Sequence, residues 1–265
     1  MAVNDWKNFL VPYEQAVDEL KVKIRSIRKE YRKRNEYSPI EFVTGRVKEV
    51  SSILEKANKF QIPVNRIGYE LEDIAGLRIM CQFVDDIDRV VEILRERKDM
   101  QILYEKDYVR NVKQSGYRSY HMRIKYPVNM ASGNIEILAE FQIRTLAMNF
   151  WATIEHSLNY KYKKRLPKEL KDKLKSAADA AFKLDEEMLE IKDEIKDAQK
   201  LFEVKSDIIS NIMNKILVLS SLDRIVEASR YEKSLNRLLE DGEVWELDKL
   251  LDCINRDIEK FREKS

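Results

Sequence analysis

The sequence predicts an α/β fold of the α+β type, in which a β-sheet flanked by helices is followed by an all-helical extension. Apolar and β-branched runs with strand spacing lie before Pro167, whereas helical spacing continues after it. Five of the six glycines and all five prolines also lie at or before Pro167, so strands and turns belong to the first part. We therefore expect two domains, 1–165 and 166–265, the second serving oligomerisation or regulation.

Composition limits the class of protein. A chain of 265 residues can form one sizeable core with a helical appendage, and 44% hydrophobic residues exclude wholesale disorder. No apolar run approaches the ~20 residues that span a bilayer, and the first residues lack a signal-peptide pattern. We expect a soluble, cytoplasmic protein that does not bind a membrane. The two cysteines, far apart in sequence, argue against a disulfide framework or a cysteine metal site.

Charge is divided unevenly along the chain. Residues 1–165 carry 30 Lys and Arg against 23 Asp and Glu, and residues 166–265 carry 19 against 24. The first part is therefore about +7 and the second about −5, so a polyanionic ligand would favour the first part.

Two helices with basic residues are predicted at the N-terminus. Residues 4–34 form a long amphipathic helix, whose basic end is either a solvated face or a surface for an anion or nucleic acid. Residues 46–60 form a second helix on which Lys48, Ser52 and Lys56 repeat every four residues. With Arg46 they make a basic row that suits a triphosphate, although lysines at this spacing also occur simply for solubility.

The stretch Tyr69–Phe83 combines a buried strand with charged residues at its mouth. Asp73 precedes the apolar run and is a natural Mg²⁺ ligand at the strand entrance. Gly76 permits close approach to the backbone, and Arg78 supplies a planar cation for a base or a phosphate. A salt-bridged edge of an ordinary core strand is the alternative interpretation.

A basic, tyrosine-containing loop follows the next two predicted elements, a helix over 86–97 and a strand over 101–109. The loop, residues 110–121, places Lys113, Tyr117 and His121 around a glycine. Such a mixture can hold a nucleotide by base stacking and phosphate contacts. Tyrosines beside strands also serve as rim packing, but rim packing does not need the basic groups.

Two further strands are predicted over 120–128 and 135–145. Alternation in the second puts Ile137, Ala139 and Phe141 on one face and Glu140 and Gln142 on the other. Helices would cover the apolar face and leave a charged open face. There Asp73 and Glu140 could converge, one holding a metal and the other accepting a proton.

The rest of the chain is predicted to be helical. A helix over 144–163 presents a polar stripe that includes Asn149 and His156, and the residues after Pro167 form amphipathic helices without catalytic groups. The sequence contains neither a Gly-x-x-x-x-Gly-Lys phosphate loop nor a Gly-x-Gly-x-x-Gly fingerprint, so side chains must hold any nucleotide. Neither histidine is followed by aspartate, so no histidine-aspartate hydrolase site and no hydrolase activity are expected.

Five ordered motifs together resemble the synthetase domain of the RelA/SpoT family, specifically its small, stand-alone alarmone synthetases. They are Gly-Arg-Val-Lys at 45–48, Glu-Asp-Ile-Ala-Gly-Leu-Arg at 72–78, Ser-Gly-Tyr-Arg-Ser-Tyr-His at 115–121, Glu-Phe-Gln-Ile-Arg-Thr at 140–145 and Asn-Phe-Trp-Ala-Thr-Ile-Glu-His at 149–156.

The resemblance implies a nucleotidyltransferase-like mixed β-sheet flanked by helices. It also implies transfer of the β,γ-pyrophosphate of ATP, with Mg²⁺, to the 3′-hydroxyl of GDP or GTP, which yields AMP and the alarmones ppGpp or pppGpp of the stringent response. By similarity, Arg46 and Arg78 sandwich adenine, Lys48, Ser52 and Lys56 hold the ATP phosphates, Asp73 and Glu140 bind the metal, and Glu140 deprotonates the acceptor. Acceptor binding falls to Lys113, Tyr117, His121, Gln142 and Asn149.

Relatives of this kind often form homotetramers, some of them activated by guanosine tetra- or pentaphosphate. Lys21, Arg25, Phe42 and Thr44 fall near the corresponding allosteric region, and RNA is a further candidate regulator. Two alternative functions stay open: a toxin-like pyrophosphokinase that modifies the 3′ end of tRNA, and a non-catalytic RNA-binding protein. Retention of both Asp73 and Glu140 argues against the second, because an acidic pair gains nothing beside RNA.

Overall fold

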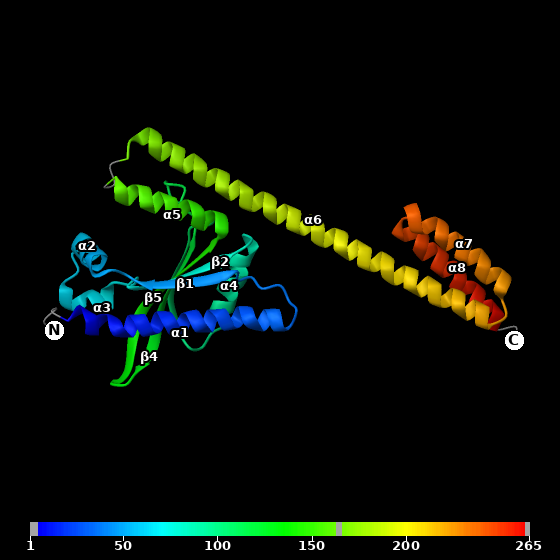
Figure 1. The fold of residues 1–265 in the computed structure, drawn as a ribbon, viewed down its shortest axis with the longest axis horizontal. Helices are drawn as coiled ribbons and strands as arrows, with labels where there is room; N and C mark the ends of the chain where they lie inside the picture. The colour runs from blue at the N-terminus through cyan, green and yellow to red at the C-terminus, as the bar shows by residue number, and fades with distance from the viewer. Residues whose placement is uncertain (1–4, 163–165, 263–265) are drawn as a thin grey trace. The chain divides into compact units, whose positions relative to one another are not determined.

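The computed structural model describes residues 5–162 and 166–262 (Figure 1). The chain divides into two compact units, Met1–Leu189 and Glu190–Ser265. No helix of the described ranges is long and apolar enough to cross a membrane. Both cysteines, Cys81 and Cys253, are free thiols, as expected.

The first unit is built on a five-stranded mixed sheet, which confirms the predicted fold class. Its strands are β1 (Phe42–Val47), β2 (Ala75–Cys81), β3 (Gln101–Asp107), β4 (Tyr120–Met130) and β5 (Gly133–Thr145), in the spatial order β1-β2-β5-β4-β3. β2 and β5 are parallel and all other neighbours are antiparallel. The parallel pair at the centre brings the entrance of β2 and the middle of β5 to the same region.

The strand register lines up polar side chains in two rows across the sheet. Paired residues on neighbouring strands point to the same face of a sheet. One row runs Arg46, Gly76, Glu140, Arg123 and Tyr104, and the next runs Thr44, Arg78, Gln142, His121 and Lys106. The open face of the sheet is therefore strongly charged, and Gly76 leaves a gap in the middle of its row.

Helices cover the other face, as the alternation of β5 predicts. α1 (Trp6–Lys33) begins with Asp5 as its N-cap and packs along the sheet through Tyr13, Ala16, Val17, Leu20 and Ile24 (Figure 1). α4 (Asp85–Arg95) adds Ile87, Val90, Val91 and Leu94 to the same core. The remaining elements before the C-terminal helices are α2 (Val50–Phe60), η1 (Val64–Arg66), α3 (Ile67–Glu70) and α5 (Leu146–Lys161).

The prediction of a helix over 46–60 was wrong at its start. Arg46 and Val47 continue β1, where they pair with β2, and the backbone N–H of Lys48 donates to the Ile74 carbonyl at 2.9 Å. The helix begins only at Val50. Lys48, Ser52 and Lys56 therefore do not form one row on a helix, because strand pairing satisfies the backbone up to Lys48.

The C-terminal part is helical, as predicted, with α6 (Lys168–Ser221), α7 (Ile225–Asp241) and α8 (Val244–Arg262). The beginning of α6 belongs to the first unit, where Trp151 Nε1 donates to the Leu174 carbonyl at 2.8 Å. The end of α6 packs with α7 and α8 in the second unit around Ile212, Leu247 and Ile254. The first compact unit thus extends into α6, past residue 165.

Candidate functional site

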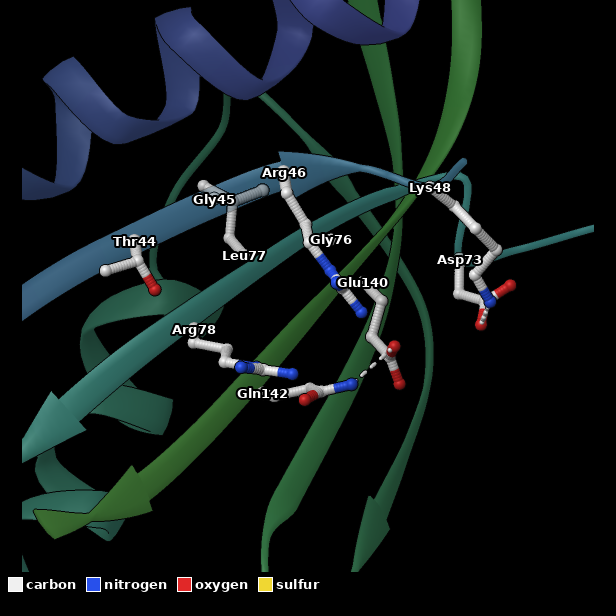
Figure 2. Close-up of a pocket in the computed structure, with 10 residues that line it drawn as sticks. All are labelled: Thr44, Gly45, Arg46, Lys48, Asp73, Gly76, Leu77, Arg78, Glu140 and Gln142. Atoms are coloured by element: carbon white, nitrogen blue, oxygen red, sulfur yellow. Dashed lines mark hydrogen bonds and ion pairs between the residues drawn. The ribbon is translucent and has the colours of Figure 1, made fainter. Parts of the chain in front are cut away.

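A pocket of about 270 Å³ lies on the open face of the sheet, over β1, β2 and β5 (Figure 2). It is lined by Thr44, Gly45, Arg46, Lys48, Asp73, Gly76, Leu77, Arg78, Glu140 and Gln142. Asp73 and Glu140 meet here because parallel pairing of β2 with β5 places Gly76 opposite Glu140, three residues after Asp73. The convergence expected of the two carboxylates is therefore present.

Gly76 provides the floor of the pocket between two arginines. Among the described residues, a Cβ atom built on Gly76 would approach only the Arg46 carbonyl oxygen, at 3.9 Å, so the glycine leaves open space rather than a tight backbone contact. Arg46, next to Gly76 on β1, and Arg78, two residues further along β2, point to the same face of the sheet (Figure 2). Burial, together with the charges of Arg144 and Arg46, lowers the pKa of Arg78, which marks a region of concentrated positive charge suited to an anionic ligand.

Asp73 is the centre of a cation cluster. The ammonium groups of Lys48 and Lys56 each donate to Oδ2 of Asp73 at 2.6 Å. Burial raises the pKa of the Asp73 carboxyl, but these two hydrogen bonds outweigh it, and the net pKa is lowered. Oδ1 of Asp73 is buried and has no hydrogen-bond partner among the described residues, so an ionised oxygen is left for a ligand.

Glu140 is the centre of a second cluster. Its Oε1 lies 2.6 Å from His121 Nδ1 and forms an ion pair with Arg123, and its Oε2 accepts from Gln142 Nε2 at 2.8 Å. The side chain is only 3% exposed. Burial raises the pKa of Glu140, but the His121 hydrogen bond and the Arg123 charge outweigh burial and lower the pKa to about 2. Burial lowers the pKa of His121, so the pair consists of a carboxylate and a neutral imidazole.

The loop before β4 forms an aromatic cluster beside Glu140. The ring centroids of Tyr108, Tyr117 and His121 lie 5.2 to 6.2 Å apart in edge-on contacts. The Lys113 ammonium lies 4.2 Å from the Tyr108 ring and 4.7 Å from the Tyr117 ring. The predicted gathering of Lys113, Tyr117 and His121 is therefore observed.

The start of α6 holds this loop in place. Gly116 has φ of +87°, and a Cβ built on it would lie 2.6 Å from Cβ of Ala178. Arg118 pairs with Asp179 at 3.0 Å, and Thr145 donates to Asp185 at 2.6 Å. Contacts with a helix that comes 60 residues later in the chain therefore fix the position of Tyr117.

Some predicted residues do not line the pocket on the open face of the sheet. Ser52 is exposed on α2, one turn before Lys56. Asn149 lies on α5, and its buried Oδ1 has no hydrogen-bond partner among the described residues.

The four residues of the predicted allosteric region lie on two elements. Lys21 and Arg25 belong to α1, with Lys21 paired to Asp18 at 2.9 Å, and Phe42 and Thr44 belong to β1. Thr44 lines the pocket on the open face of the sheet, whereas the Lys21 side chain lies against Gly45.

Two site residues were missed in the sequence. Arg123 pairs with Glu140 and Glu72, and Arg144 is buried beneath Tyr117 and Gln142. Arg123 follows His121 by two residues on a predicted strand, so alternation alone would have placed both on one face. Nothing local distinguishes Arg144 from an exposed arginine at the end of a strand.

A mixed sheet whose open face carries two ionised carboxylates among arginines and lysines is suited to phosphoryl-group transfer, which depends on positioning and charge neutralisation. Comparisons identify the class. A family model described as the region found in RelA / SpoT proteins matches residues 45–165. The GTP pyrophosphokinase YjbM of Bacillus subtilis is 57% identical over 200 residues, which cover 76% of this chain and 94% of the relative.

Solved structures agree with the family match. The small alarmone synthetase 1 of Bacillus subtilis bound to its product pppGpp is 57% identical, with a TM-score of 0.70, over 72% of this chain and 98% of that one. The structure of the same synthetase bound to AMPCPP is 54% identical, with a TM-score of 0.65, over 73% and 98% of the two chains. The present chain belongs to the RelA/SpoT family, among its small alarmone synthetases.

Proposed function

We propose that this chain transfers the β,γ-pyrophosphate of ATP to the 3′-hydroxyl of GDP or GTP, yielding AMP and ppGpp or pppGpp. The observation that carries the proposal is the meeting of the Asp73 and Glu140 clusters at one pocket of the open sheet face. Its relatives support the choice of substrates, since one is named a GTP pyrophosphokinase and another was solved with pppGpp.

The ATP end of the site is assigned to β1, β2 and α2. Arg46 and Arg78 lie on either side of the space over Gly76, where their planar guanidinium groups can sandwich adenine. Lys48 and Lys56 provide ammonium groups for the ATP phosphates, and Ser52 adds a hydroxyl one turn from Lys56. Arg46 and Lys48 come from the end of a strand rather than from a helix, which aims them across the sheet.

Mg²⁺ is the proposed metal, and the residues present fit it. The described residues contain no group of three or more metal-ligating side chains, but protein sites for Mg²⁺ typically use one or two carboxylates together with substrate phosphates. Asp73 offers at the pocket a buried Oδ1 that has no hydrogen-bond partner in the described part of the chain, and Glu140 is ionised beside it. Bound there, Mg²⁺ would neutralise charge on the transferred phosphates.

The guanosine acceptor is assigned to the aromatic cluster beside Glu140. Tyr117 would stack on guanine, with the base taking the place that Lys113 now has over the ring and freeing its ammonium for acceptor phosphates. The Asn149 amide oxygen, unpaired within residues 5–162 and 166–262, can accept from a base edge. His121 and Gln142 face the same side of the sheet and complete the acceptor site.

The transfer step forms a bond between the acceptor O3′ and the β-phosphorus of ATP and breaks the bond from that phosphorus to the α,β-bridging oxygen. Glu140 takes the proton of the 3′-hydroxyl, and AMP leaves with the bridging oxygen. Because the transition state of phosphoryl transfer carries charge on phosphate oxygens, Lys48, Lys56 and Arg123 stabilise it by position rather than by covalent chemistry.

Assembly and regulation complete the proposal. A homotetramer is proposed, with residues 166–265 serving oligomerisation or regulation. Lys21, Arg25, Phe42 and Thr44 are the proposed site for activation by ppGpp or pppGpp, and RNA is a candidate regulator. If product nucleotide leaves the initial rate unchanged at subsaturating substrate, the proposed activation is wrong.

The test is incubation of the purified chain with ATP, Mg²⁺ and GDP or GTP, with nucleotides separated by ion-exchange chromatography and Glu140→Gln as the control. AMP appearing in equal amount with a guanosine 3′-pyrophosphate supports the proposal. Pyrophosphorylation of tRNA, added as a separate acceptor, would support the toxin-like alternative. Absence of AMP from folded protein, even with product nucleotide added as activator, contradicts the proposal.

A further inference from the structure

Arg144, near the end of β5, is a buried cation whose hydrogen-bond partners among the described residues are neutral. Its side chain is 4% exposed, and its Nε donates to Ser119 Oγ at 3.1 Å. Its Nη2 donates to the Tyr117 hydroxyl at 2.6 Å and to Gln142 Oε1 at 2.7 Å. Burying a guanidinium without a carboxylate partner costs stability, so a residue chosen for stability alone would be apolar here.

The bond from Arg144 to the Tyr117 hydroxyl begins a chain that ends on Glu140. The Tyr117 hydroxyl lies 2.7 Å from His121 Nε2, and His121 Nδ1 lies 2.6 Å from Glu140 Oε1. A carboxylate only accepts, so His121 Nδ1 donates to it, and Nε2 is the ring nitrogen left to accept from the Tyr117 hydroxyl. Because Arg144 can only donate, the Tyr117 hydroxyl accepts from it and donates to Nε2. Each bond in the chain thus has one direction.

The bond from Arg144 to Gln142 begins a shorter chain, which ends on the other oxygen of the Glu140 carboxylate. Arg144 Nη2 holds the amide oxygen of Gln142, so the amide NH₂ must point away from it. Gln142 Nε2 then donates to Glu140 Oε2 at 2.8 Å (Figure 2). One buried guanidinium therefore orders donors to both oxygens of Glu140, through side chains from two neighbouring strands.

We infer that Arg144 is a positioning residue for the transfer step, which fixes the orientation of the Glu140 carboxylate through Tyr117–His121 on one oxygen and Gln142 on the other. The inference rests on the proposed function, in which Glu140 accepts the proton of the acceptor hydroxyl. Arg123 forms an ion pair with Oε1 of Glu140 and supplies charge, but contact at one oxygen leaves the carboxylate free to turn about that oxygen. Two ordered donors on different oxygens remove that freedom.

The test is Arg144→Met, which keeps an unbranched stem and replaces the guanidinium by an apolar end. We expect kcat to fall roughly 10- to 100-fold, as for loss of other residues that orient a reacting group, while the KM for ATP changes by less than about twofold. The matched control is Arg110→Met, which removes a guanidinium from the same loop but pairs with Asp88 and Asp107, outside both chains to Glu140. A smaller effect on kcat is expected there.

A double-mutant cycle separates orientation from a structural contribution. Tyr117→Phe keeps the ring and deletes only the hydroxyl, and should lower kcat with little change in acceptor KM. In the Arg144→Met background the same change should have no further effect, because the chain is already broken. Tyr108→Phe is the control, since its ring packs on the same two rings.

The outcomes are decisive for the inference and separable from the proposed function. Suppose that the wild type is active. If Arg144→Met then keeps kcat within about twofold, or if its effect on kcat adds to that of Tyr117→Phe, the role of Arg144 is overturned and the proposed function is not. If Arg144→Met does not fold by circular dichroism, Tyr117→Phe against Tyr108→Phe decides: equal kcat values overturn the inference. A folded wild type without synthetase activity contradicts the proposed function itself.

Discussion

His121 donates through Nδ1 to Oε1 of Glu140 at 2.6 Å, from the strand next to the one that carries the carboxylate. Burial favours the neutral forms of both groups, yet the hydrogen bond, with the charge of Arg123, keeps Glu140 ionised with a pKa of about 2. The carboxylate is therefore ready to accept a hydroxyl hydrogen at neutral pH. A low pKa makes it a weak base on its own, so its orientation and the charges around the phosphates must contribute most of the acceleration.

Replacing Glu140 by Gln is expected to lower kcat by at least about 100-fold while the fold is retained. The amide keeps the size of the side chain and can still accept from His121, but it cannot take a proton. Product formation is measured by ion exchange and folding by circular dichroism. Turnover near that of wild type in folded E140Q would show that Glu140 is not the base.

Substitutions at Gly76 are expected to fill the ATP pocket without disturbing the sheet. A Cβ there meets only one atom, at 3.9 Å, and β-branched residues suit a strand, so Gly76→Val should fold with less than about 1 kcal/mol of lost stability. Its side chain would take the space between Arg46 and Arg78, so the KM for ATP should rise roughly tenfold or more, and less in Gly76→Ala.

Gly45→Ala is the contrasting variant for this experiment. A Cβ at Gly45 would lie 2.8 Å from Cγ1 of Val17 on α1, so this change should lower the melting temperature. Binding of an ATP analogue by calorimetry, with thermal unfolding of each variant, separates the two effects. Equal ATP affinity in Gly76→Val and wild type would mean that adenine does not lie over Gly76.

The sequence contained enough information for the sheet and for the meeting of the two carboxylates. Alternation in residues 135–145 assigned Glu140 to the polar face, and the apolar run after Asp73 predicted β2. The start of α2 was misplaced because Val47 and Val50 have helical spacing, whereas pairing of Val47 with Ala75 decides the conformation. Local spacing cannot reveal a partner strand nearly thirty residues away.

Arg144 shows a second limit of the sequence. Alternation continues the polar face of β5 from Glu140 and Gln142 to Arg144, and an open face implies exposure. It is buried because Ser119, from the loop before β4, and Tyr117 lie over it. Burial of a strand residue by distant loops depends on tertiary packing, which no local pattern encodes.

Tyr117→Ala is expected to weaken the acceptor and spare ATP. Stacking of a base on an aromatic ring contributes about 1–3 kcal/mol, so the KM for GDP or GTP should rise about 5- to 150-fold. Arg46 and Arg78, which are assigned to adenine, lie on other strands. Initial rates with each substrate varied in turn measure both constants. An unchanged acceptor KM would exclude stacking on Tyr117.

Asp185→Asn is expected to stabilise the protein at neutral pH. Asp185 is 5% exposed and accepts from Thr145 Oγ1 at 2.6 Å, and burial raises the pKa of this carboxyl from 3.8 to about 6. The folded state thus holds the proton more tightly than the unfolded state does. The stability that this carboxyl contributes is present in full below about pH 4 and is lost as pH rises through about 6.

The difference between the two pKa values corresponds to up to about 3 kcal/mol, most of which Asp185→Asn should recover at pH 7, since the amide oxygen can still accept from Thr145. Denaturant unfolding from pH 4 to 8 measures the effect: the variant should gain on wild type between pH 4 and 6 and keep a constant advantage above. Asp172→Asn, which changes an exposed carboxylate on the same helix, is the control and should follow wild type. A constant difference between Asp185→Asn and wild type across the whole range would mean that Asp185 keeps an ordinary pKa, and that the start of α6 binds to the sheet equally well at every pH.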